Sequence, residues 1–65
     1  MINEYKDILI EFEILQIKIE ELEKIISLIK TSDALNETSK LQTVSFLEGY
    51  MKGLKEKREW LKQKI

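Results

Sequence analysis

An alternation of three- and four-residue spacings between apolar residues constrains the fold more than any other feature of the sequence. This heptad spacing places the apolar side chains on one stripe of an α-helix, which we call the seam. In the first half of the chain the predicted seam comprises Tyr5, Ile8, Phe12, Leu15, Ile19, Leu22, Ile26 and Ile29. In the second half it comprises Leu41, Val44, Leu47, Met51, Leu54, Leu61 and Ile65, and Arg58 takes one apolar position.

Helix-ending signals separate the two halves of the seam. Asn3 can cap the first helix, and the Thr-Ser-Asp run at 31–33 favours side-chain hydrogen bonds over continued helix. Either Asn36 or Ser39 can cap the second helix, and Ser39 has Gln42 three positions later, as in a capping box. The short connection between the helices requires them to run antiparallel.

We therefore predict an all-α fold, an antiparallel two-helix hairpin of the coiled-coil type that occupies residues 1–65 as a single domain. The absence of proline from the sequence agrees with long helices. In the turn, Ala34 and Leu35 are expected to fold inward. The predicted elements are a helix over about 3–30, a turn over about 31–36 and a helix over about 37–65.

A second apolar face predicts self-association. On the first helix this face lies almost opposite the seam, and one aromatic residue of the second helix joins the predicted interface. A helix that is apolar on two opposite faces is normally packed on both, so we expect a homo-oligomeric helical bundle, at least a dimer with four helices. The alternative is a face reserved for a different protein. The predicted interface residues are Ile10, Ile14, Ile17, Ile25, Leu28 and Phe46.

Two glycines and several cationic and aromatic residues make the end of the second helix a candidate site. Each glycine costs ~1 kcal/mol relative to alanine in a helix, so a compensating role is expected. The structural interpretation is a close helix–helix crossing; the functional interpretation is a pocket that binds an anionic ligand such as a nucleotide. The candidate ligand-binding residues are Gly49, Tyr50, Gly53, Lys57, Arg58, Trp60 and Lys64.

The composition argues against several classes of function. The chain has no histidine and no cysteine, which removes the usual acid–base, nucleophilic and soft-metal chemistry, so we expect no enzyme, no metal and no cofactor. Charged residues interrupt every apolar run, so we expect a cytoplasmic protein without a membrane partner. The net charge of −1 also argues against a nucleic-acid partner.

Charge is distributed unequally between the two halves. Residues 1–35 carry four lysines against eight acidic residues, for −4, whereas residues 36–65 carry seven basic against four acidic residues, for +3. Attraction between neighbouring antiparallel helices explains this pattern most simply. Recognition of an external anion is the alternative.

In outline the chain resembles two groups of proteins. Short phage proteins have a similar series of motifs, here Tyr5–Asp7, Lys18–Lys24, Leu35 with Asn36, and Gly49–Leu54. Small homodimeric hairpins such as the plasmid copy-control protein Rop are similar in length and bundle topology. The phage resemblance implies a small accessory factor, often one that opposes host defence, and it assigns a role to no individual residue.

Three hypotheses of function follow. In the first, a non-catalytic homo-oligomer sequesters a nucleotide-type host immune signal between its protomers. In the second, the bundle inhibits or adapts a host protein by direct contact. In the third, the chain is a Rop-like nucleic-acid-binding or purely structural bundle, although its acidic first helix is unsuited to contact with a phosphate backbone.

Overall fold

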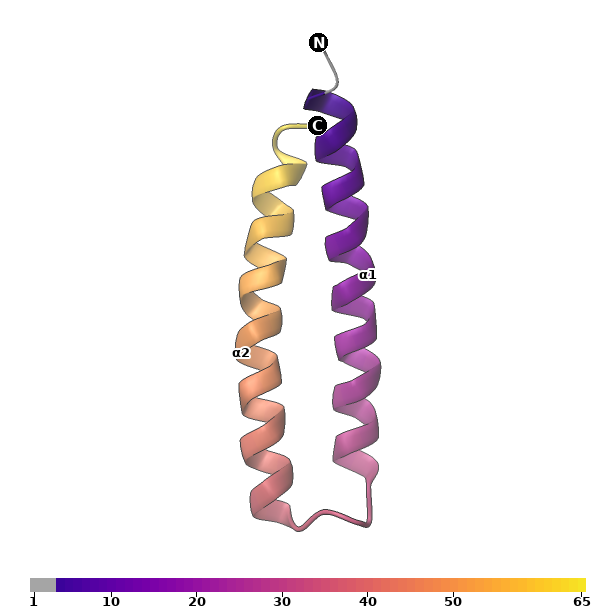
Figure 1. Cartoon of the computed structure of the whole chain (residues 1–65). Helices are drawn as coiled ribbons and strands as arrows, with labels where there is room; N and C mark the ends of the chain where they lie inside the picture. Colours follow the sequence, from indigo (N-terminus) through magenta and orange to yellow (C-terminus); the bar gives the residue numbers. More distant parts are fainter. Residues whose placement is uncertain (1–3) are drawn as a thin grey trace.

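The computed structural model describes residues 4–65, which form an antiparallel hairpin of two long helices. Helix α1 spans Glu4–Thr31 and helix α2 spans Glu37–Lys62. The helices lie side by side, a short turn joins them at one end, and the start of α1 and the C-terminus lie at the other end (Figure 1). The molecule is a rod with Cα extents of 52 × 14 × 13 Å. The predicted hairpin is confirmed, whereas the expected Asn3 cap lies outside the described residues.

The seam is the core of the hairpin. Its best covered side chains are no more than 7% exposed, and the residues between them on the same stripe are half-buried. Heptad positions a and d of two antiparallel helices face each other, so these residues cover one another within the chain. The buried hydrophobic residues are Leu15, Ile19, Ile26, Val44 and Leu61.

The seam differs from the prediction at the beginning of α2. Leu41 was expected in the seam, but it is 69% exposed. A strict heptad counted back from Val44 and Leu47 places Lys40 in the core-facing position, with Leu41 one step outside it. The Lys40 side chain is only 17% exposed, and its ammonium lies 3.7 Å from Glu37 Oε1. Lys40 thus packs its aliphatic stem against the core while its charge reaches the surface.

Local hydrogen bonds define the turn and the start of α2. The Asn36 side chain accepts a hydrogen bond of 2.7 Å from the Ser39 backbone N–H, so Asn36 is the cap and Ser39 lies inside the helix. Ala34 and Leu35 are exposed, which shows that their predicted inward folding was wrong. The Ala34 N–H binds Ser32 Oγ at 3.1 Å, so local polar contacts and not apolar burial shape this turn.

The open end of the rod is less covered than its middle. Tyr5 and Ile65 are 56% and 45% exposed, although both continue the heptad spacing. Helix α2 ends at Lys62 instead of continuing to residue 65, and the Lys64 N–H binds the Leu61 carbonyl at 2.9 Å in a closing turn. At the open end each helix has fewer neighbouring residues to pack against, so the seam weakens there.

Candidate interaction surface

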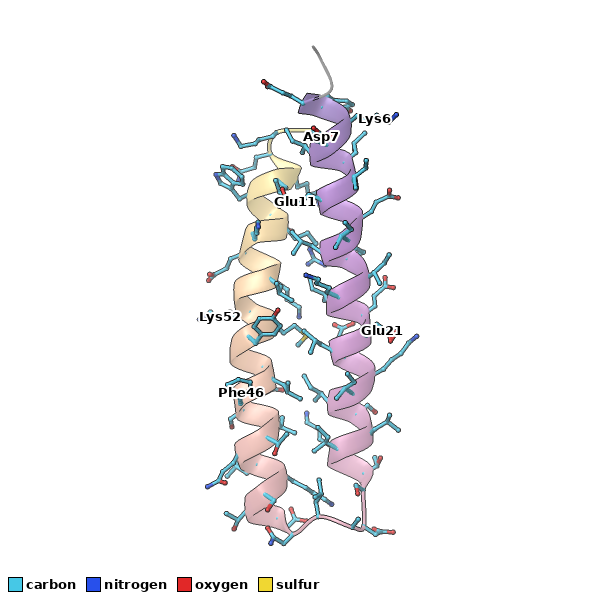
Figure 2. The ribbon with its side chains drawn as sticks, viewed as in Figure 1. Lys6, Asp7, Glu11, Glu21, Phe46 and Lys52 are labelled. Carbon is cyan, nitrogen blue, oxygen red and sulfur yellow. The ribbon has the colours of Figure 1, made fainter. Side chains whose placement is uncertain are left out.

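Ion pairs between the helices distinguish two broad sides of the hairpin. On one side, Lys57 Nζ lies 3.2 Å from Glu11 Oε2; both residues occupy heptad position g. On the opposite side, Lys55 Nζ lies 3.9 Å from Glu23 Oε2; both occupy position e. In an antiparallel pair the g positions meet on one side of the seam and the e positions on the other. Figure 2 shows Glu11 between the two helices.

The side that carries the g positions holds six large exposed hydrophobic residues, and we call it the apolar side. Position c is next to position g on a helix, so both rows of both helices belong to this side. Six large hydrophobic side chains lie there, each between 44% and 75% exposed. Exposed apolar clusters of this kind are typical of interaction surfaces. The hydrophobic residues of the apolar side are Ile14, Ile25, Leu28, Phe46, Tyr50 and Trp60. Charged residues of the same two rows lie between them, namely Glu4, Asp7, Glu11, Lys18, Glu21 and Lys57.

The opposite side, formed by positions b and e, is dominated by charged residues, and we call it the charged side. Lys30 Nζ and Glu48 Oε2 are 3.8 Å apart there, with both side chains more than half exposed. Screened surface pairs of this kind contribute ~0–1 kcal/mol each, so this side keeps the hairpin hydrated more than it stabilises it. Its principal residues are Glu20, Glu23, Lys30, Glu48, Lys52 and Lys55.

All six predicted interface residues are exposed within the single chain. Four of them, Ile14, Ile25, Leu28 and Phe46, belong to the apolar side. Ile10 and Ile17, which are 47% and 60% exposed, lie on the outer edge of α1 next to that side. An open depression of about 490 Å³ begins at this edge and reaches the Glu11–Lys57 ion pair.

The predicted ligand-binding residues occupy different surfaces. Tyr50, Gly53, Lys57 and Trp60 belong to the rows of the apolar side, and Lys64 follows the end of α2. Gly49 lies on the outer edge of α2, and Arg58 lies in the seam between the helices. The periodicity of α2 therefore directs Arg58 away from the other predicted ligand residues, toward α1.

The three cations of the predicted ligand site each have a partner within the chain. The Arg58 Nη1 group donates a hydrogen bond of 2.8 Å to Gln16 Oε1, and this contact is partly buried. Lys57 pairs with Glu11, as described above. Lys64 Nζ lies 4.2 Å from the centroid of the Trp60 ring, a cation–π contact.

The two glycines lie beside open space. A Cβ atom built on Gly49 or Gly53 would meet nothing within 4 Å. The structural interpretation of these residues was a close helix–helix crossing, and neither glycine lies at such a crossing within the described chain. Their helix-propensity cost of ~1 kcal/mol each is offset by no contact inside this chain.

The sequence pattern identified the hydrophobic residues of the apolar side but did not predict that they share one surface. It put Phe46 with the isoleucines and Leu28 of α1 in one group, and Tyr50 and Trp60 in another. The available signal was the pairing of Glu11 with Lys57, because that pair identifies the side on which the two helices share their g positions.

The described part of the chain holds neither a metal-type cluster nor a membrane-spanning helix. Over residues 4–65 no group of three or more acidic side chains is arranged to hold a metal ion. Neither helix in this range is long and apolar enough to cross a membrane. No family model, curated protein or solved structure matches the chain.

Proposed function

We propose that the chain is a non-catalytic accessory protein that acts stoichiometrically as a homo-oligomer, through protein–protein contacts on its apolar side. The observation that carries this proposal is the gathering of six exposed hydrophobic side chains on one broad side of the hairpin. Complete burial of one such side chain contributes ~1.5–3 kcal/mol, so covering all six is a large driving force for association.

The small core of the single hairpin supports the same proposal. Five hydrophobic residues of the described chain are buried, while the total accessible surface is 5062 Å². A domain of this size buries a limited fraction of its surface and often depends on oligomerisation for stability. An assembly that covers the apolar side would enlarge the core with residues that the hairpin alone leaves in water.

Protein contact explains the apolar side better than an anionic ligand does. A phosphate-binding site needs cations that are available to the ligand. Here Arg58 binds Gln16, and Lys57 binds Glu11. The apolar side chains, in contrast, have no partner that would cover them within the described chain.

Sequestration of a nucleotide-type signal, an activity that would oppose host defence, is the second candidate. One observation favours it: Trp60 is 55% exposed and borders an open depression of about 450 Å³ lined also by Lys52 and Lys55. An aromatic ring with nearby cations is suited to stacking on a base and attracting its phosphates. Glu56 and Glu59 line the same depression and oppose the binding of an anion.

Native mass spectrometry of the protein purified from its own host tests both candidates together. We expect a single homo-oligomeric species without a retained small molecule, and Ile14→Glu should convert it to monomer. Glu20→Lys, on the charged side, is the matched control and should keep the assembly. A monomeric native protein would contradict the proposal.

Calorimetry with linear and cyclic nucleotides separates the second candidate from the first. Binding that weakens with added salt and disappears in Trp60→Ala would favour sequestration, since exposed ionic contacts are screened over ~8–10 Å. Absence of binding across the panel would leave the protein-contact function.

A further inference from the structure

We infer that the occupant of the apolar side is a second copy of this chain, packed with its turn at the same end of the bundle. In this arrangement α1 of each copy lies against α2 of the other, around a twofold axis parallel to the rod. The inference rests on the proposed homo-oligomeric function and defines its geometry. It follows from the levels of the side chains along the rod and from the charges of the two helices.

Contacts within the hairpin establish which residues are level with each other. Arg58 Nη1 lies 2.8 Å from Gln16 Oε1 near the middle of the rod. Lys30 Nζ lies 3.8 Å from Glu48 Oε2 near the turn. Counting along both helices at the same rise per residue from the Arg58–Gln16 contact makes three apolar pairs level to within one residue. Counting from the longer Lys30–Glu48 contact shifts the levels by four residues along α2, about 6 Å. The three apolar pairs are Ile14 with Trp60, Ile25 with Tyr50, and Leu28 with Phe46.

A twofold axis parallel to the rod preserves these levels and exchanges the helices. Leu28 of one copy then faces Phe46 of the second copy, and Ile14 faces Trp60 of the second copy. Each large hydrophobic residue of the apolar side is thus level with another hydrophobic residue, and the Trp60 ring also borders the depression lined by Lys52 and Lys55. The symmetry is closed, so association stops at the dimer and exposes no repeating surface.

End-over-end packing, the other twofold arrangement of the same side, gives poorer pairs. When the two rods overlap fully, α1 lies on α1, and Leu28 faces Asp7 of the second copy. Ile14 then faces Glu21 of the second copy, so both of these apolar residues meet a carboxylate. Sliding the rods until only their turn-proximal halves overlap removes these contacts but leaves Ile14 and Trp60 uncovered.

Helix charge favours the same arrangement. The first half of the chain carries −4 and the second half +3. With the turns at the same end, the acidic helix lies against the basic helix of the other copy, whereas end-over-end packing places like charges together. Such complementarity favours one orientation over the other. The rod measures 52 by 14 Å between Cα atoms, and a side of this size offers on the order of 700 Å², close to the ~800 Å² per partner of stable interfaces.

Disulfide trapping tests the geometry directly, because the natural chain has no cysteine. Two single variants, Leu28→Cys and Phe46→Cys, are mixed and oxidised, and the covalent species are identified by mass. A disulfide needs Cα atoms ~4.4–6.8 Å apart, so we expect the mixed dimer at least about tenfold above the control mixture. The control is Glu20→Cys with Lys52→Cys, both on the charged side. Ile25→Cys with Tyr50→Cys provides a second pair if the first disturbs folding.

The outcomes distinguish the geometry from the function. Preferential trapping of Leu28→Cys with Asp7→Cys would overturn our arrangement in favour of end-over-end packing. A dimer in sedimentation velocity that traps neither the 28–46 nor the 25–50 pair would overturn the geometry while leaving the homo-oligomer intact. If the unmodified chain sediments as a monomer, both the geometry and the proposed function are wrong.

Discussion

The seam and the apolar side use the same kinds of residue in opposite environments. Ile19 and Leu61 in the seam are each 2% exposed, whereas Leu28 and Phe46 on the apolar side are 69% and 75% exposed. Seam positions face each other inside the hairpin, whereas g positions meet only at its edge and c positions have no facing element within the described chain. Residue type alone therefore does not distinguish the residues that form the core of the hairpin from those available for self-association. The heptad position of each residue makes this distinction.

Substitutions at two isoleucines give the most direct comparison of the seam with the apolar side. Ile19→Ala should lower the free energy of unfolding by ~2–5 kcal/mol, because it leaves a cavity in the seam. Ile14→Ala, at a position 47% exposed in the single chain, should cost much less when measured under dilute, monomeric conditions. Urea denaturation followed by circular dichroism measures both. Equal losses would show that the two regions do not differ as described.

A charge placed on the apolar side should affect assembly and not folding. We expect Phe46→Glu to weaken self-association by at least about 100-fold, roughly 2.7 kcal/mol, with helical content unchanged. Lys52→Glu, on the charged side, should sediment like the natural chain. Sedimentation equilibrium measures the two constants, and retention of assembly by Phe46→Glu would remove that residue from the interface.

Arg58 tests whether the polar member of the seam stabilises the fold or binds a ligand. Its side chain is 23% exposed and bonded to Gln16, so Arg58→Ala should lower the free energy of unfolding by ~1.5–3 kcal/mol. Arg58→Met retains an apolar stem and should lose less. Chemical denaturation ranks the variants. A loss of nucleotide binding at unchanged stability would instead assign Arg58 to a ligand site.

Removing the cap of α2 should have a moderate effect that is independent of both regions. Asn36→Ala is expected to cost ~1 kcal/mol, because it leaves a helix N–H group without its side-chain acceptor. Ser39→Ala is the matched control, since the Ser39 backbone N–H and not its hydroxyl makes the capping contact. Similar losses in thermal denaturation would return Ser39 to consideration as a cap.

Substitutions at the two glycines should have the smallest effect on stability, and they compare a position on the apolar side with a position outside it. Gly49→Ala and Gly53→Ala should each stabilise the monomeric helix by ~0.8–1 kcal/mol, because a Cβ at either position meets nothing within 4 Å. Only Gly53 lies on the apolar side, so only Gly53→Ala should also weaken self-association. Thermal denaturation and sedimentation of the two variants separate these effects. An unchanged assembly in Gly53→Ala would exclude a role for its open space in packing.

The periodicity predicted the hairpin because each helix repeats its apolar residues in register with its own turns. It misplaced Leu41, where Lys40 occupies the core-facing position. Classifying residues only as polar or apolar assigns every lysine to the surface. The long aliphatic stem of a lysine can nevertheless cover the core while its ammonium remains in water. The expected inward turn failed because Ser32 supplies a local hydrogen bond to the Ala34 N–H, and Leu35 remains 39% exposed.

The sequence by itself determined two helices, their antiparallel order and the existence of apolar residues beyond those needed to join them. Tertiary structure decided which of these residues share a surface. The reason is geometric: periodicity reports positions on one helix, whereas a side of a hairpin is composed of rows from two helices. Only the packing of α1 against α2, marked by the Glu11–Lys57 pair, brings Leu28 and Phe46 to the same side and turns Arg58 toward Gln16.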